Sequence, residues 1–169
     1  DVDRGVYVRP GIPEFMRDRV VPAAQIVTPN HFELDLLTGR TTTSVGEVLE
    51  AAAALRATGP DVVLVTSTVL DSDEPDEIQM LIDTANGSWR VATPRLEQTF
   101  TGSGDLTAAL FLAHYLDGED PSTAMGRTAD AVYSVLEVTA RAGSAELMLV
   151  GAQDQLVDPD HHFEVERVR

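Results

Sequence analysis

The chain has 169 residues, of which 43% are hydrophobic, and this is enough for one folded domain with a buried core. Its 28 acidic side chains against 12 Lys and Arg give a net charge of -16, which argues against nucleic acid or an anionic membrane surface as a partner. The chain has no cysteine and its apolar runs are too short to span a bilayer, so we expect no disulfides, no membrane partner and a cytoplasmic location.

The N-terminal part of the chain alternates predicted strands with predicted helices. Gly5 to Val8 is predicted to form a short strand, Glu14 to Val21 a helix and Ile26 to Thr28 a buried strand. His31 to Leu37 is predicted to form a short helix that Gly39 closes.

The middle of the chain continues this alternation. Ser44, followed three residues later by Glu47, is a capping-box pattern that predicts a helix from Val45 to Ala57. Val62 to Thr66 is a continuous apolar run, which is typical of a strand buried on both faces.

A hairpin, two long helices and a last strand are predicted for the remainder. Ile78 to Thr84 and Trp89 to Ala92, joined through Asn86-Gly87, indicate a hairpin at the edge of the sheet. The elements that follow are Asp105 to Leu116, Pro121 to Ala142 and Phe163 to Val168. Alternating strands and helices predict an α/β fold with a mostly parallel sheet flanked by helices.

A glycine-rich turn with one acid precedes the first of these long helices. The two glycines allow a positive φ and a close approach of the backbone to a ligand, and the helix dipole favours an anion at the free N–H groups. We therefore predict that Gly102, Ser103 and Gly104 form an anion hole. Asp105 would be the base that accepts a proton from a substrate hydroxyl as that hydroxyl attacks phosphorus.

The same four residues, Gly102 to Asp105, also fit an ordinary loop that ends in an Asp helix cap. The chain contains no Gly-Lys-Ser or Gly-Lys-Thr, so the turn is not a Walker loop, and it lacks the third glycine of a dinucleotide fingerprint. There is no lysine, so any positive contact to phosphate must come from Arg, from backbone N–H groups or from a metal ion.

The loops that follow the predicted strands are the other candidate site. Open α/β sheets bind ligands beyond the carboxyl ends of their strands, which points to the loops after Val27, Thr66 and Ala92. Asn30 and Glu33 are three residues apart at the start of a helix, so their side chains share one face. Helix capping with solvated side chains is the alternative interpretation of this pair.

The order of these segments resembles the C-terminal part of pyridoxal kinases of the ribokinase-like superfamily. The segments that carry the resemblance are Gly5 to Phe15, Ile26 to Leu34, Val62 to Ser67, Trp89 to Leu96, the Gly-x-Gly-Asp signature at Gly102 to Asp105, and Gln153 to Phe163. Hydroxymethylpyrimidine phosphate kinases share this fold and usually have a cysteine where Asp105 stands, so the lack of cysteine favours the pyridoxal group.

The resemblance implies transfer of the ATP γ-phosphoryl group to the 5'-hydroxyl of pyridoxal, with Mg²⁺, in a homodimeric enzyme. It implies that Asp105 is the general base and contacts the substrate, and that Glu33 organises Mg²⁺ through water. The nucleotide-binding residues that it implies are Thr28, Asn30, Glu33, Thr66, Ser67, Thr93, Pro94, Arg95 and Leu96.

Members of this family begin with a large N-terminal portion that this chain lacks. Residues 1–169 are therefore expected to be the C-terminal, nucleotide-binding part of a kinase domain, which alone would bind nucleotide weakly and turn over pyridoxal poorly. Two alternatives are a non-catalytic nucleotide-binding or interaction module, and a kinase for another alcohol such as hydroxymethylpyrimidine.

Overall fold

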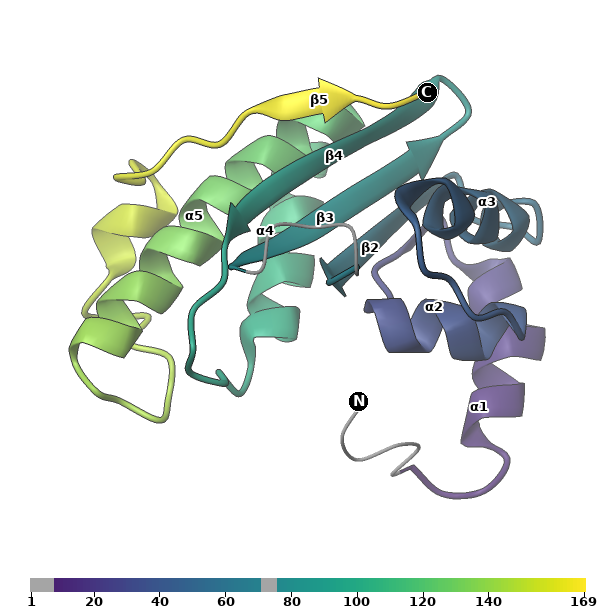
Figure 1. Cartoon of the computed structure of the whole chain (residues 1–169), viewed down its shortest axis with the longest axis horizontal. Helices are drawn as coiled ribbons and strands as arrows, with labels where there is room; N and C mark the ends of the chain where they lie inside the picture. Colours follow the sequence, from purple (N-terminus) through teal and green to yellow (C-terminus); the bar gives the residue numbers. More distant parts are fainter. Residues whose placement is uncertain (1–7, 71–75) are drawn as a thin grey trace. The chain divides into compact units, whose positions relative to one another are not determined.

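The computed structural model describes residues 8–70 and 76–169 (Figure 1). The predicted strand from Gly5 to Val8 lies outside these residues except for Val8, which is in a bend. The described chain divides into two compact units. The first contains residues 8–70 with Met80–Arg90 and Arg167–Arg169, and the second contains residues 76–79 with Val91–Glu166.

The helices and strands predicted from His31 to Thr66 are confirmed, with small changes at their ends. The helix predicted from Glu14 to Val21 is instead a succession of short α, π and 3-10 turns, and the strand predicted as buried at Ile26 is half-buried. The elements of this part of the chain are α1 (Ile12–Phe15), the π-helical turn η1 (Met16–Val20), the short 3-10 helix η2 (Val21–Ala23), β1 (Ile26–Val27), α2 (His31–Thr38), α3 (Val45–Arg56) and β2 (Val62–Thr68). Capping explains where the two longer helices begin. The Asn30 side chain accepts the N–H of Glu33 in α2, and the Ser44 side chain accepts that of Glu47 in α3.

The core of the first unit lies where α2 and α3 pack against each other and against β2. Its buried residues are Val21, Leu34, Val48, Leu49, Ala51, Ala52, Leu55, Val63, Val65, Leu70 and Leu81. The Ala-rich middle of α3 lets this helix approach its neighbours closely. Gly59 serves the same purpose in the connection to β2, because a Cβ there would overlap the carbonyl oxygen of Pro22.

The sheet has five strands in the order β1-β2-β3-β4-β5, where β3 is Glu77–Thr84, β4 is Gly87–Pro94 and β5 is Val165–Arg167. β1 and β2 are parallel because α2 and α3 form a crossover between them. The β3–β4 hairpin is confirmed. Beyond the end of β5, Ser88 and Arg169 each donate a backbone N–H to the other's carbonyl, as antiparallel partners do.

Two details of the predicted sheet are wrong. The sheet is mostly antiparallel, because the connections from β2 to β3 and from β3 to β4 are too short to contain a crossover helix. The β3–β4 hairpin is also not at the edge of the sheet, since β5 follows β4 in the strand order. The last strand is shorter than predicted and takes the edge position.

In the second unit the two long predicted helices are α4 (Ser103–Leu116) and α5 (Pro121–Arg141), which pack against each other, followed by the 3-10 helix η3 (Gln153–Leu156). Phe111 of α4 and Met125 of α5 are fully buried. Asp120 caps α5, with Pro121 at its first position. No helix within residues 8–70 and 76–169 has the length and apolarity that a bilayer span needs.

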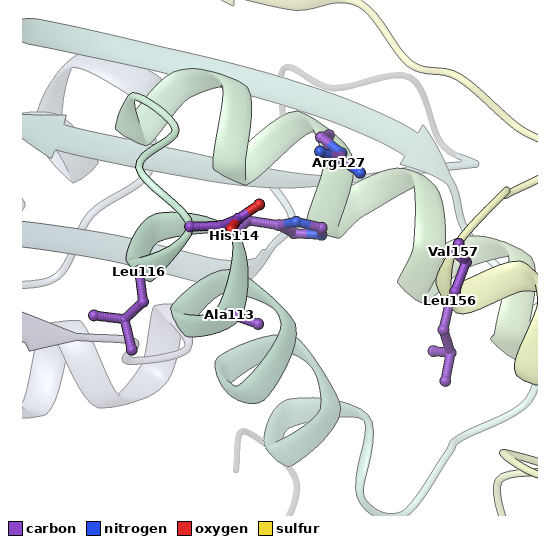
Figure 2. Close-up of a pocket in the computed structure, with 7 residues that line it drawn as sticks. Ala113, His114, Leu116, Arg127, Leu156 and Val157 are labelled. Carbon is purple, nitrogen blue, oxygen red and sulfur yellow. The ribbon is translucent and has the colours of Figure 1, made fainter.

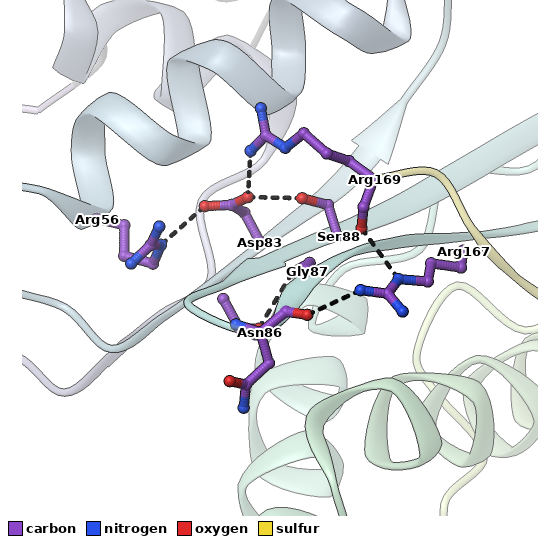
Figure 3. A network of polar contacts seen from close by, with 8 residues as sticks. Arg56, Asp83, Asn86, Gly87, Ser88, Arg167 and Arg169 are labelled. Carbon is purple, nitrogen blue, oxygen red and sulfur yellow. Dashed lines mark hydrogen bonds and ion pairs between the residues drawn. The ribbon is translucent and has the colours of Figure 1, made fainter.

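A buried carboxylate fixes the far end of β3 in the first unit (Figure 3). Asp83 is fully buried and accepts hydrogen bonds from Ser88 Oγ at 2.7 Å, Arg56 Nε at 2.8 Å and Arg169 Nη2 at 2.7 Å. Burying a charge is costly unless it is paired and hydrogen-bonded, and this charge meets three donors. The network therefore ties the β3–β4 hairpin to α3 and to the C-terminal residues.

Candidate active site

The first turn of α4 begins at a glycine in the left-handed region. Gly102 is the N-cap with φ 90°, and its carbonyl accepts the N–H of Leu106 at 3.0 Å. The N–H groups of Ser103, Gly104 and Asp105 precede this first intrahelical bond, so they have no intrahelical acceptor. A side chain on Gly104 would meet nothing within 4 Å. The turn thus presents three free donors at the positive end of a helix.

Asp105 is the third residue of α4 and is exposed. The cap is Gly102, which has no side chain, so Asp105 does not cap the helix. The Asp105 carboxylate makes no hydrogen bond or ion pair with the residues that the structure describes, and it remains available to another molecule.

Two hydroxyls stabilise the backbone of this turn. Ser103 Oγ donates to the carbonyl of Phe100 at 3.0 Å, and Thr107 Oγ1 donates to the carbonyl of Ser103 at 2.8 Å. Thr107 is buried, so its hydroxyl needs such a partner. Both bonds lie within the turn and the first helical residues.

The loop before Gly102 is also held by residues that follow α5. Gln98 Nε2 donates to the carbonyl of Ser144 at 2.5 Å, and Thr101 forms a parallel bridge with Glu146. The Leu147 side chain lies 3.7 Å from the position that a Cβ on Gly102 would take. These partners were not predicted, because contacts between residues more than forty positions apart leave no local pattern in a sequence.

The first unit contains a second cluster of predicted site residues at the ends of β1 and β2. The Thr66 N–H donates to the carbonyl of Pro29 at 2.9 Å, and Thr66 forms a parallel bridge with Asn30. Ser67, the next residue, has φ 53° and is the one non-glycine residue with positive φ in the described chain. Such strained backbone conformations gather at functional sites, although strain alone assigns no function.

Glu33 takes part in the capping box that the alternative interpretation expected. Its Oε2 accepts the Asn30 N–H at 2.9 Å, and Asn30 Oδ1 accepts the Glu33 N–H at 2.9 Å. The other Glu33 oxygen is unpaired within residues 8–70 and 76–169, and the side chain is exposed. No three His, Asp or Glu residues of the described chain gather as a metal site. A magnesium ion near Glu33 would therefore keep most of its waters.

The remaining predicted site residues lie at strand ends. Thr28 follows β1 and is half-buried. Thr93 and Pro94 end β4, and the Thr93 side chain is buried. The Arg95 N–H donates to the carbonyl of Asp76 at 2.6 Å, while the Arg95 side chain is exposed.

The predicted site residues are divided between the two units. The first contains Thr28, Asn30, Glu33, Thr66 and Ser67, and the second contains Thr93, Pro94, Arg95, Leu96, Gly102, Ser103, Gly104 and Asp105. The structure brings Asn30, Glu33 and Thr66 together, and it brings Gly102 to Asp105 together with their supporting loop.

A shallow hollow of about 520 Å³ lies at the other end of α4, between α4, α5 and η3 (Figure 2). His114 and Arg127 line it together with apolar side chains such as Leu156. Arg127 pairs with Glu119, and His114 Nε2 has no hydrogen-bond partner in the described chain. At 1.5 Å per residue the lining residue Leu116 is about 16 Å along the helix from Asp105, so the hollow is separate from the glycine turn.

Comparison with known proteins links this chain to one family of kinases. A family model described as phosphomethylpyrimidine kinase matches residues 6–149. Pyridoxal kinase PdxY of Rubrobacter xylanophilus is 50% identical over 169 residues, which are 99% of this chain and 58% of that protein. Pyridoxal kinase PdxY of Leifsonia xyli is 44% identical over 164 residues, 97% of this chain and 58% of that protein.

A solved structure of a pyridoxal kinase also matches this chain. The crystal structure of pyridoxal kinase from Entamoeba histolytica matches with a TM-score of 0.84 at 28% identity. The match covers 96% of this chain and 57% of that chain. The chain therefore spans less than two thirds of the length of the relatives and structures that it matches.

Proposed function

The chain belongs to the phosphomethylpyrimidine kinase family, and from this membership we propose that it is the nucleotide-binding part of a pyridoxal kinase. The whole enzyme would transfer the γ-phosphoryl group of ATP to the 5'-hydroxyl of pyridoxal, giving pyridoxal 5'-phosphate and ADP. The names of the relatives that are 44% and 50% identical support this choice of substrate.

One observation carries the proposal: Asp105, whose carboxylate has no partner among residues 8–70 and 76–169, lies in the same helical turn as three N–H groups without an intrahelical acceptor. The donors suit the oxygens of a transferring phosphoryl group, whose negative charge they would stabilise. Asp105 would take the proton of the 5'-hydroxyl while the new oxygen–phosphorus bond forms and the bond to the leaving ADP breaks. Positioning and electrostatics suffice for this reaction, and a covalent intermediate is not required.

For the residues of the first unit, taken by themselves, we also propose contacts to nucleotide phosphates. The side-chain amide N–H of Asn30 and the hydroxyls of Thr66 and Ser67 could donate to phosphate oxygens, with Thr28 two residues before Asn30. The free oxygen of Glu33 fits a water-mediated contact to Mg²⁺, which would balance phosphate charge in a chain that has no lysine. Residues 93–96, with the exposed Arg95, would cover the adenosine half.

The same proposal includes ATP and pyridoxal as the molecular partners, a cytoplasmic location and a homodimer. The net charge of -16 supports the exclusion of nucleic acid. Whether two copies associate can be measured directly by sedimentation.

Two other functions are compatible with the sequence. The description of the family model favours phosphorylation of a hydroxymethylpyrimidine as the second candidate. Offering both alcohols to the full-length protein with ATP separates the two, since the preferred alcohol has the higher kcat/KM. A non-catalytic nucleotide-binding module would phosphorylate neither.

Replacing Asp105 tests the assigned base. In the full-length protein, Asp105→Asn should lower kcat for pyridoxal by at least roughly a hundredfold, because general-base catalysis contributes about 10²-fold to 10⁴-fold. The midpoint of urea unfolding should fall only slightly, since the carboxylate makes no bond with the described residues and loses only its weak interaction with the helix dipole. The control is Asp117→Asn, an exposed acid just after the other end of the same helix. A kcat for Asp105→Asn equal to that of the control would exclude Asp105 as the base.

A further inference from the structure

The loop that leads into the glycine turn has little support of its own. Between the end of β4 at Pro94 and the start of α4 at Ser103, the chain forms no helix or strand. Within the loop itself, the structure gives one side-chain bond, from Ser103 Oγ to the carbonyl of Phe100. Because this loop has so few internal hydrogen bonds, it needs contacts from another segment to hold one conformation.

That support comes from residues 144–148, which follow α5. They meet the loop at three successive points: Gln98 donates to the Ser144 carbonyl, Thr101 pairs with Glu146, and Leu147 packs beside Gly102. The contacts run in parallel along both segments and end at the glycine that opens α4. Loss of one of them would therefore loosen the backbone that carries the free N–H groups.

Residues 144–148 are in turn hydrogen-bonded to α5 through one buried residue. Thr139 is fully buried, and its Oγ1 accepts the Met148 N–H at 3.1 Å while donating to the Val135 carbonyl at 2.8 Å. The Thr139 carbonyl accepts the Ser144 N–H at 3.2 Å. One residue of a long packed helix thus fixes both ends of the segment.

We propose that residues 144–148 are a clasp that positions the anion-binding turn, with Gln98 and Thr139 as its positioning residues. This inference depends on the proposed function, because it assigns the turn a phosphate to bind. Hydrogen-bond donors stabilise a transferring phosphoryl group only when they are held within a fraction of an ångström of their working positions. The clasp supplies that order from α5.

Two variants and their controls test the clasp in the full 169-residue chain. Gln98→Ala removes the donor to Ser144, and Thr139→Val removes the hydroxyl at nearly constant volume. Thr139→Ser keeps the hydroxyl and should restore the behaviour of the unaltered chain. Gln155→Ala is the matched control, since Gln155 Nε2 donates to Asp160 in the same unit at 2.9 Å but contacts neither the loop nor the clasp.

Two measurements are made on each variant: hydrogen exchange at the Leu106 N–H, whose acceptor is Gly102, and titration with a non-hydrolysable ATP analogue and Mg²⁺. Removing one hydrogen bond should speed exchange and weaken nucleotide affinity by roughly threefold to tenfold in Gln98→Ala and Thr139→Val. Thr139→Ser and Gln155→Ala should match the unaltered chain in both.

The outcomes separate the clasp from the proposed function. Exchange and affinity that stay unchanged in Gln98→Ala would overturn the clasp, even if the unaltered chain binds nucleotide. Faster exchange with unchanged affinity would also overturn the proposal, because the order of the loop would then make no difference to nucleotide binding. If exchange changes as expected but the unaltered chain binds no nucleotide, the proposed function fails and the clasp is only a structural contact.

Discussion

Two aspartates show how differently a single carboxylate is used in this chain. Asp105 is exposed and has no partner among the described residues, so its charge costs little and can serve a reaction. Asp83 is fully buried and has three donors, so its charge is committed to holding the hairpin, α3 and the C-terminal residues together. Substitution of Asp105 should therefore lower activity with little effect on stability, and substitution of Asp83 should lower stability.

Asp83→Asn should therefore destabilise the chain. Removing the charge weakens the bonds from Arg56 and Arg169, whose side chains are 28% and 52% exposed and stay partly solvated, so we expect a loss of about 2 kcal/mol. Urea unfolding should show a lower midpoint than in the unaltered chain. Asp18→Ala, which breaks an exposed pair with Arg17, is the control and should leave the midpoint where it was. Equal midpoints for the two variants would show that the Asp83 network does not contribute to stability.

The role of a single residue can be predicted from the sequence where a short-range pattern marks it, and cannot where its partner is distant in the chain. The Gly-x-Gly-Asp turn, the Asn30–Glu33 pair and the Ser44–Glu47 box follow from spacing, because capping and helix dipoles act within a single turn. Gln98 has no such signal. Asp83 has a local signal: an acid directly after the apolar residues Met80 to Ile82 of a predicted strand indicates a charge that must find partners.

Among the elements, α5 shows how a helix start can depend on pH. Asp120 accepts hydrogen bonds from the hydroxyls of Ser122 and Thr123 and from both of their N–H groups. These bonds, led by those from the two hydroxyls, stabilise the ionised carboxylate and lower the pKa of Asp120 from 3.8 to about 2. The cap is exposed, so solvent screens part of this stabilisation.

The folded-state pKa of Asp120 lies below its ordinary value of 3.8, which fixes the sign of the effect. The stabilisation is fully present above pH 3.8 and is lost as the pH falls through about 2. Compared with Asp120→Asn, the unaltered chain should be more stable by about 1 kcal/mol above that window. The difference should shrink as acid is added, in urea unfolding followed at each pH. A difference that is constant or grows in acid would contradict the assigned pKa.

Element types were easier to predict than the direction of the strands. The helices α2, α3, α4 and α5 have clear apolar patterns with start and stop residues, and all were found. The sheet was predicted as mostly parallel because strands and helices alternate in the first part of the chain. The connection from β2, which ends at Thr68, to β3, which begins at Glu77, is too short for a crossover helix, and the short turn at Asn86 already required an antiparallel pair.

For the molecule as a whole, the two compact units share the predicted site residues between them. The chain also covers 58% of its curated relatives, so a complete reaction is proposed for the whole protein and a nucleotide site for this chain. The proposed function and the proposed clasp both depend on nucleotide binding at the turn that begins α4.

The most direct measurement is calorimetric titration of the chain with a non-hydrolysable ATP analogue and Mg²⁺, comparing Gly102→Ala with Gly118→Ala. Gly102 has φ 90° and Gly118 has φ 93°, so both substitutions strain the backbone alike, but Gly118 lies in the turn between α4 and α5. We expect saturable binding to the unaltered chain and to Gly118→Ala, and binding at least roughly tenfold weaker for Gly102→Ala. Equal affinity in all three proteins, or no binding by a chain that circular dichroism shows to be folded, would contradict the proposed nucleotide site.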